Sequence, residues 1–183
     1  MTEIRRAKIE DALALRALLE SMLREDALWI RMNVRHLGKE GDWIQNIIKD
    51  DRVHSVNGGK FFFFAFDEER LVGYVNGMSW AHAPLEVFNR MVEKHGLQGE
   101  RPGHVGIAVH KDYRRQGLGT RLIEKALQEL REMGATTVTS AIHVDNKPAL
   151  SFFRKMGFTV YKKEKLQIFV RRKISGANYL RDC

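Results

Sequence analysis

The segment Val109–Thr120 constrains this chain more than any other stretch of its sequence. An apolar run ends at its first residue, a basic turn containing Arg114 and Arg115 follows, and Gly117 and Gly119 open an amphipathic segment. The first turn of a helix leaves N–H groups without partners, and the helix dipole favours an anion beside them. Glycines there let a pyrophosphate approach the backbone. The segment therefore predicts a strand, a phosphate-binding turn and a helix, although an isolated Gly-x-Gly can also serve only the geometry of a tight turn.

The whole chain alternates apolar strands with amphipathic helices, which predicts a single mixed α/β domain over residues 1–183. No repeat, low-complexity segment or linker divides it. Strands are expected over Glu3–Ala7, Phe61–Phe66, Leu71–Trp80, His104–His110, Thr136–Val144, Phe158–Lys162 and Leu166–Lys173. Helices are expected from Glu10 onward, around Trp43–Lys49, within Ala81–Gly103, over Gly117–Met133 and over Asn146–Met156.

The composition is that of an ordinary soluble globular protein, with 44% hydrophobic and 30% charged residues. The longest apolar run is Phe61–Phe66, far short of the roughly 20 residues that cross a membrane. The opening segment Met1–Arg6 lacks the apolar core of a secretory signal, and the single cysteine is Cys183, so no internal disulfide forms. We therefore expect a cytoplasmic protein with no membrane partner and no metal site.

The net charge of +8 is concentrated near the carboxyl end, where the segment Arg154–Lys173 holds eight basic residues and one acid. Lysines commonly blunt a strand edge against aggregation, so a solvated edge explains them. The alternative is an anion site for phosphates or nucleic acid. Because no aromatic stacking pattern accompanies the charges, the strand edge is the favoured interpretation and nucleic-acid binding the weaker one.

Two motifs resemble those of the GNAT superfamily of acyl-CoA-dependent N-acyltransferases. Arg114-x-x-Gly117-x-Gly119 is similar to the pyrophosphate motif of that family, in its expected place between strand and helix. The segment Asn146–Phe158 looks like its second motif, an asparagine and alanine followed by an aromatic, a basic residue and Gly-Phe. The opening Ile4–Ala7 is also similar to the usual start. The two motifs follow in order about 30 residues apart, so the resemblance spans nearly the whole chain.

The resemblance implies a GNAT fold, in which a central, mostly antiparallel sheet is flanked by helices and splayed between the fourth and fifth strands. It also implies acetyl-CoA as co-substrate, held in that opening, with strand backbone along the pantetheine arm and a glycine turn around the pyrophosphate. The residues that would bind the cofactor are Ile107, Val109, Arg114, Arg115, Gln116, Gly117, Leu118, Gly119, Thr120 and Asn146.

Catalysis is where the sequence departs from the family. Many members carry a tyrosine as general acid where this chain has Phe153, and others place a glutamate at the positions of Gly103 or Ala141. Attack of an amine on a thioester needs a group that accepts a proton. A thiol has a pKa near 8.5, so the thiolate can leave with water as its proton source. The remaining candidates for the base are His143 and His104.

The phase of each strand separates the two histidines. His104 lies opposite in phase to Val105 and Ile107, so it faces away from the family's fourth-strand glutamate position. His143 is in phase with Ala141 and shares the face of the missing fifth-strand glutamate, which makes it the favoured candidate. A buried structural histidine is the alternative interpretation.

His82 and a chain of water molecules remain further alternatives for the base. The resemblance implies that the acceptor lies against the first two helices and the long joint between the third and fourth strands. Aromatic residues there could form an apolar wall of the acceptor site, and acids could bind a cationic amine. The alternative is that the aromatic residues pack in the core and that the acids are solvated surface charges. They are Trp29, Trp43, Trp80 and Phe88 for the wall, and Glu20, Asp26 and Glu86 for the acids.

The expected function is therefore transfer of an acetyl group from acetyl-CoA to a primary amine. The acceptor is a small molecule, a protein N-terminus or a lysine side chain, and the strand-rich end is a possible homodimer contact. Two alternatives stay open. One is a CoA-binding regulatory module without turnover, suggested by the missing tyrosine and glutamates, and the other is nucleic-acid binding through the basic carboxyl-terminal hairpin.

Overall fold

The computed structural model describes residues 2–24, 59–81 and 83–174. Strands follow one another as β1 (Glu3–Arg6), β2 (Gly59–Asp67), β3 (Arg70–Ser79), β4 (Pro102–Val109), β5 (Thr137–His143), β6 (Thr159–Lys163) and β7 (Gln167–Lys173). The helices are α1 (Ala12–Leu23), α4 (Leu85–His95), α5 (Leu118–Glu132) and α6 (Lys147–Lys155), with single 3-10 turns η1 (Ile9–Asp11) and η3 (Lys111–Tyr113). Every strand predicted from the sequence is present, and each predicted helix in the described ranges is confirmed. The helix predicted around Trp43–Lys49 lies outside the described residues, as do Trp29, Asp26 and His82.

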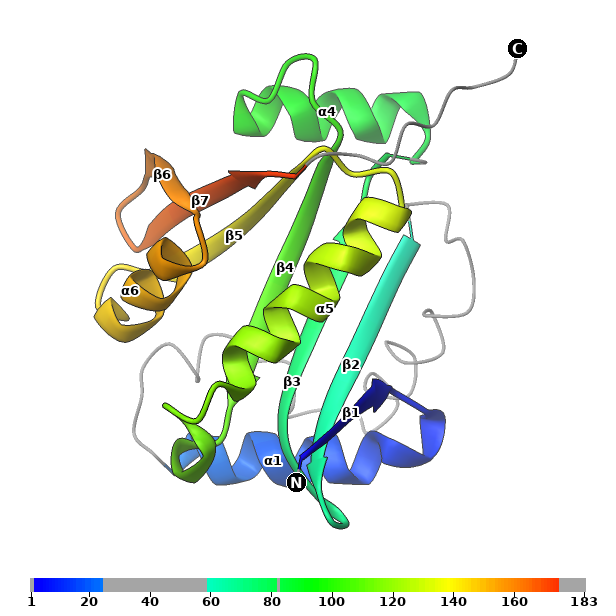
Figure 1. Ribbon diagram of the computed structural model, residues 1–183. Coiled ribbons are helices and arrows are strands. Elements are labelled where there is room, and N and C mark those ends of the chain that lie inside the picture. Colours follow the sequence, from blue (N-terminus) through cyan, green and yellow to red (C-terminus); the bar gives the residue numbers. More distant parts are fainter. Residues whose placement is uncertain (1, 25–58, 82, 175–183) are drawn as a thin grey trace.

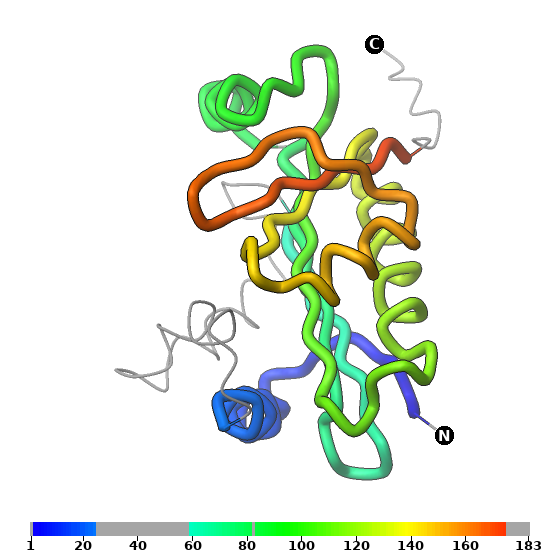
Figure 2. Tube along the Cα trace, turned by 90° about the vertical axis from the view of Figure 1, so that its left-hand side faces the viewer, coloured from blue at the N-terminus to red at the C-terminus, as the bar shows by residue number. Residues whose placement is uncertain are grey.

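The strands form one seven-stranded sheet in the order β1-β2-β3-β4-β5-β7-β6. Neighbours β4 and β5 run parallel, while the other neighbouring pairs are antiparallel. Helices α5 and α6 cover one face, and α1 and α4 lie against the other (Figures 1 and 2). The prediction of a mostly antiparallel sheet flanked by helices is confirmed.

The strand β2 shows why an unbroken apolar run forms part of this sheet. Phe61 and Phe63 join the core beneath α5, whereas Phe62, Phe64 and Phe66 join the core beneath α1. Since successive side chains point to opposite faces of a strand, a strand covered on both faces needs apolar residues at every position. The run of phenylalanines therefore fixes β2 inside the sandwich of helices.

Helix α4 is the long joint between β3 and β4, and it is attached to the far end of the sheet. The imidazole Nδ1 of His95 lies 3.0 Å from the hydroxyl of Tyr161 on β6, and its ring stands edge-on to Phe169 of β7 at 5.9 Å. Burial lowers the pKa of His95, with Lys94 and Lys162 adding to the effect. Leu97, just past the helix, is fully buried. These contacts hold α4 over β7 on the face opposite α5.

No helix in the described ranges is long and apolar enough to cross a membrane. Among the same residues, no group of three or more His, Cys, Asp or Glu side chains is placed to hold a metal ion.

Candidate active site

The sheet opens between its parallel neighbours. In the described chain, β4 pairs with β5 only where Pro102, Gly103 and His104 face Thr137, Val138 and Thr139. Beyond these pairs β4 and β5 diverge in a V (Figure 1). Strand β5 pairs with β7 along its whole length. The predicted splay is confirmed, and we call the end at His104 and Thr139 the narrow end.

The backbone of β4 presents an edge to this opening. The N–H of His110 donates to the carbonyl of Val72 on β3 at 2.8 Å. Because the amides of a strand point alternately to either side, those of Val105, Ile107 and Val109 are directed at the opening. The stretch 105–109 spans about 13 Å at the ordinary rise of a strand. The edge therefore offers the extended hydrogen-bonding surface predicted for Ile107 and Val109, although the carbonyl of Val109 already accepts from Nε of Arg114 at 2.9 Å.

A turn with two left-handed residues lies past the wide end of the V, between β4 and α5. Arg115 and Gly117 adopt left-handed conformations, with φ of 64° and 78°. Gly117 is the N-cap of α5 and has no side chain with which to cap the N–H groups of the first turn. Among the described residues, nothing lies within 4 Å of a Cβ added to Gly117, so its positive φ and not crowding is what favours glycine there. The turn thus has the geometry of a phosphate cradle.

The other predicted cofactor residues surround this turn. A Cβ added to Gly119 would meet Phe152 at 3.5 Å, an ordinary contact, so the position accepts a methyl group but directs anything longer outward. The side-chain amide of Gln116 donates to the carbonyl of Asp112 at 2.7 Å. Asn146 caps α6 by accepting from the N–H of Ala149 at 3.1 Å. Leu118 is buried, and Thr120 is partly exposed in the first turn of α5.

The turn is anchored to the hairpin between β2 and β3. The hydroxyl of Tyr113 donates to Asp67 at 2.7 Å, which raises the pKa of Tyr113. The guanidinium of Arg70 lies 3.2 Å from Nε2 of His110. Since guanidinium only donates, Nε2 of His110 is the acceptor. These bonds hold the loop in place before any ligand arrives.

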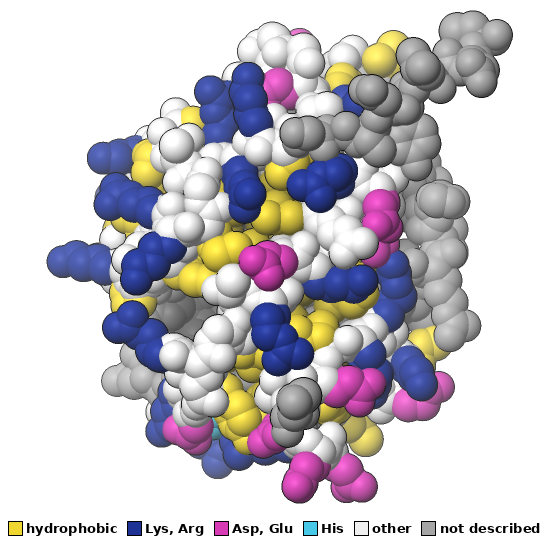
Figure 3. Space-filling view, viewed as in Figure 1, with side chains coloured by type: hydrophobic (Ala, Val, Ile, Leu, Met, Phe, Trp, Pro, Cys, Tyr) yellow, Lys and Arg dark blue, Asp and Glu magenta, His cyan; other side chains and the backbone are white. Residues whose placement is uncertain are grey.

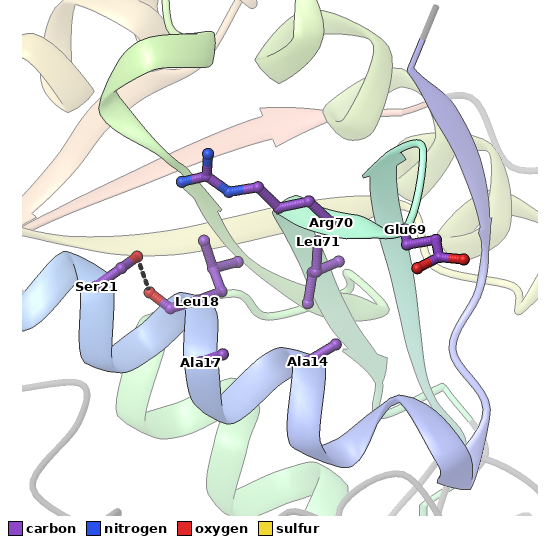
Figure 4. A pocket seen from close by; sticks show the side chains of 7 residues that line it. All are labelled: Ala14, Ala17, Leu18, Ser21, Glu69, Arg70 and Leu71. Atoms are coloured by element: carbon purple, nitrogen blue, oxygen red, sulfur yellow. Dashed lines mark hydrogen bonds between the residues drawn. The ribbon is translucent and has the colours of Figure 1, made fainter.

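A pocket of about 220 Å³ lies near this anchor, between α1 and the start of β3 (Figure 4). The side chain of Arg70 extends from it, and the hydroxyl of Ser21 donates to the carbonyl of Leu18 within its wall. It is lined by Ala14, Ala17, Leu18, Ser21, Glu69, Arg70 and Leu71. None of the predicted site residues lines it, so this pocket is separate from the opening of the sheet.

The face covered by α5 and α6 carries much of the positive charge. Figure 3 shows the surface hollowed between α6 and the amino-terminal end of α5, with Lys and Arg side chains at the border of the hollow. Helix α6 contributes Lys147, Arg154 and Lys155, and the turn contributes Arg114 and Arg115. An anionic ligand entering the wide end of the V therefore meets a favourable potential.

His104 lies at the narrow end, on the face opposite α5. Val105 is fully buried in the core beneath α5, so its neighbour His104 points to the other face, as the phase predicted. Nδ1 of His104 lies 3.4 Å from the hydroxyl of Thr139, and its ring is 6.4 Å from that of Trp80. The imidazole is half-buried. Burial lowers the pKa of His104 to about 4, with a smaller effect from His95, so the ring is neutral at physiological pH.

His143 lies at the other end of β5. Its ring is buried, Nδ1 is 3.3 Å from the N–H of Asp145, and the Asp145 carboxylate lies 3.6 Å away. Nε2 is buried without a hydrogen-bond partner in the described chain. His143 shares a face with Ala141 and Thr139, but it lies about 13 Å from Thr139 along the strand, toward the wide end. The structure therefore places the two candidate histidines in different parts of the opening.

Gly103, Ala141 and Phe153 occupy the positions where other family members carry a glutamate or a tyrosine, and the structure shows what surrounds each of them. A Cβ at Gly103 would lie 3.0 Å from the side chain of Leu130 of α5, a tight contact, so a glutamate there would require Leu130 to move. Ala141 is exposed on the open face. Phe153 is 3% exposed, and its ring packs edge-on against Phe158 at 5.0 Å. The phenyl ring is therefore part of the core beneath α5 and α6.

Thr139 is the site residue that the sequence did not single out. In the sequence it is one of several β-branched residues of a predicted strand. Its contact with His104 depends on the register between two strands that are far apart in sequence. The one signal in the sequence is a hydroxyl within a strand. The structure shows that the residue is 3% exposed, and a buried hydroxyl needs a hydrogen-bond partner.

The fold and the site together define a class. A mixed sheet that opens between parallel neighbours, with a glycine turn and a helix terminus beyond the wide end, is the arrangement of acyl-CoA-dependent acyltransferases. The chain belongs to the acetyltransferase (GNAT) family, whose model matches residues 19–158. The family expected from the two sequence motifs is confirmed.

Curated relatives are similar over part of their length. The N-alpha-acetyltransferase of Sulfurisphaera tokodaii is 33% identical over 104 residues, 55% of this chain and 58% of that protein. N-alpha-acetyltransferase 30 of Schizosaccharomyces pombe is 29% identical over 105 residues, 57% of this chain and 61% of that protein. The chain thus spans about three fifths of the length of these relatives.

Solved structures share the fold over nearly the whole chain. The PaiA N-acetyltransferase of Thermoplasma acidophilum, solved in complex with coenzyme A, superposes with a TM-score of 0.70 at 17% identity. The likeness covers 95% of this chain and 99% of that one. It confirms the GNAT fold.

Proposed function

We propose that this protein is an acetyl-CoA-dependent N-acetyltransferase that acts on primary amines and prefers an α-amine. The observation that carries the proposal is the free edge of β4, which leads from the anion-binding turn at Arg114–Thr120 to His104 at the narrow end. Membership of the acetyltransferase family supports it, as do the relatives named N-alpha-acetyltransferase and the coenzyme A complex of a structural neighbour.

The residues present fit acetyl-CoA. The first-turn amides of α5, from Leu118 to Thr120, and the cationic Arg114 and Arg115 suit a pyrophosphate. The backbone of Ile107 and the N–H of Val109 suit the amides of an extended pantetheine arm. Oδ1 of Asn146 already accepts the hydrogen bond that caps α6, so its side-chain NH₂ group is the part suited to that arm.

The direction of the arm follows from these anchors. A ligand held at the turn and laid along β4 extends from the wide end toward the narrow end. Its thioester then lies near His104 and Thr139, whereas His143 lies beside the wide end. The geometry therefore supports His104 as the proton acceptor. His143 stays a candidate for that role.

His104 constrains the acceptor through its pKa. A ring with a pKa of about 4 is always ready to accept a proton above that pH but cannot remove one from a free ammonium. The amine must arrive neutral. Its nitrogen forms a bond to the thioester carbon, the C–S bond breaks, His104 takes the proton that the nitrogen loses, and CoA leaves as a thiolate that water protonates. Phe153 offers no proton to that thiolate.

The need for a neutral amine favours N-termini over lysines. At pH 7.5 roughly a third of an α-amine is neutral, against about 0.1% of a lysine side chain, a ratio of a few hundred. A protein or peptide N-terminus is therefore the first acceptor to test. Small primary amines of similarly low pKa are the second class.

The test is acetylation of a short peptide with a free α-amine, followed by CoA thiol release and the mass of the peptide. A matched peptide with a blocked N-terminus and one lysine should react at least about 10²-fold more slowly at pH 7.5. His104→Ala should lower kcat/KM by about 10² to 10⁴, the range for a positioned base. A protein whose melting temperature rises with acetyl-CoA, but which acetylates none of a broad panel of amines, would instead be the CoA-binding regulatory module.

Three further expectations stay predictions. They are a single domain over residues 1–183, a cytoplasmic location and the strand-rich end as the candidate contact of a homodimer. Nucleic-acid binding through β6 and β7 remains the weaker alternative, and steep salt dependence of binding would reveal it.

A further inference from the structure

Thr139 faces His104 at the last pair before β4 and β5 diverge. Its side chain lies on the same face of the sheet as His104, and the residue is 3% exposed. The hydroxyl is therefore shielded from water and must find its hydrogen-bond partners within the protein.

The bonds of this hydroxyl have a defined direction. It donates to the carbonyl of Gly103 at 3.0 Å, because a carbonyl oxygen only accepts. A threonine hydroxyl has one proton, so toward Nδ1 of His104, at 3.4 Å, it can only be an acceptor. Nδ1 of His104 must then carry the hydrogen, and Nε2 is left with the lone pair.

We propose that Thr139 is a positioning residue that holds His104 in the tautomer with its hydrogen on Nδ1, so that Nε2 accepts the proton lost by the amine. The inference rests on the proposed function for its catalytic consequence. The tautomer itself is a property of the free protein and is measurable without any acceptor.

The surroundings of His104 make the tautomer decisive. Burial keeps the ring neutral, and in a neutral imidazole one nitrogen donates while the other accepts. Trp80, which packs beside the ring, carries no charge. The titratable group that acts on His104 from the packed elements is His95 of α4, whose own pKa is lowered by burial. The hydroxyl of Thr139 is thus the described contact that selects between the two nitrogens.

Two substitutions separate the hydroxyl from the shape of the side chain. Thr139→Ser keeps the hydroxyl, whereas Thr139→Val keeps the branched shape and removes it. With the full-length protein labelled with ¹⁵N in its histidine rings, nitrogen–proton correlation spectra at pH 7 report which ring nitrogen is protonated. We expect Nδ1–H for His104 in the wild type and in Thr139→Ser, and a shift toward Nε2–H in Thr139→Val.

The wild-type spectrum alone is sufficient to overturn the proposal if Thr139→Val does not fold, because Nε2–H on His104 contradicts it. An unchanged tautomer in a folded Thr139→Val protein contradicts it as well. These readouts do not require turnover, so they remain valid even if no amine is acetylated and the proposed function fails.

Kinetics with a peptide acceptor test the catalytic consequence. We expect Thr139→Val to lower kcat/KM by roughly 10²-fold, the lower end of the range for a positioned base, with KM for acetyl-CoA unchanged. Thr139→Ser should stay within about threefold of the wild type. In a His104→Ala background, Thr139→Val should cost nothing further, because residues that act as one unit are not additive. An equal loss in both backgrounds would assign Thr139 a merely structural role.

Discussion

Replacing His104 with glutamine should remove part of the acid sensitivity of the fold. The ring has a pKa of about 4 in the folded protein and about 6.5 when unfolded. Between these values the unfolded chain binds a proton that the folded chain does not, so stability is lost as the pH falls from about 6.5 to about 4. Glutamine is polar and cannot titrate.

The size of the effect follows from the shift. A difference of one pKa unit corresponds to about 1.4 kcal/mol, so His104 accounts for at most about 3 kcal/mol of the free energy of unfolding lost between pH 7 and pH 4. The half-buried ring keeps some contact with solvent, which makes this figure an upper limit. It is still large beside the 5 to 15 kcal/mol that stabilise a typical domain.

Urea unfolding at pH 7, 6, 5 and 4, followed by circular dichroism and linear extrapolation, measures the difference. Only the change of the unfolding free energy with pH is compared between the two proteins. Any pH-independent loss of stability caused by the substitution therefore cancels. Asp11 and His95 also have lowered pKa values, but they are present in both proteins. Thr139→Ser, which keeps His104, should show the full wild-type dependence. Parallel stability curves for the wild type and His104→Gln would refute the argument that burial holds this ring neutral.

Substitutions at three further positions test the site. Gly119→Glu should abolish the rise in melting temperature on adding acetyl-CoA without unfolding the protein. Gly119→Ala, whose Cβ fits at 3.5 Å from Phe152, should respond like wild type. A normal response of the glutamate variant would show that the cofactor does not bind at this turn. Phe153→Tyr should leave turnover unchanged or raise it modestly, and a large loss with CoA affinity intact would reveal a packing or acceptor-binding role of the phenyl ring. His143→Ala should lower kcat/KM less than about threefold, and a loss of about 10² to 10⁴ together with an acid-limb inflection near pH 6.5 would make His143 the base instead of His104.

The elements of the fold were predictable because their patterns are local. The phenylalanine run of β2, the amphipathic repeat of α5 and the glycine at its start each carry their information within a few residues. The two motifs then supplied the mostly antiparallel sheet and the splay between the fourth and fifth strands, through the resemblance to known proteins. Phase along β4 also predicted correctly that His104 faces away from Val105.

The arrangement within the opening was less accessible to sequence reasoning. Phase says which face a histidine occupies, but not how far it lies from the narrow end, which depends on the register between β4 and β5. That register separates His104 from His143 and brings Thr139 beside His104. The lowered pKa of His104 likewise comes from burial by distant parts of the chain, which no local pattern reports.

The opening also bears on how this sheet avoids association with other sheets. A free strand edge normally templates edge-to-edge aggregation, and proteins blunt such edges with lysines or cover them. Here β4 has neighbours on both sides, so its free edge lies within a wedge and not at the margin of the sheet. A foreign strand would have to enter between β4 and the diverging β5, where the V closes at His104. The fold thus offers unpaired backbone to a slender ligand while denying it to another sheet.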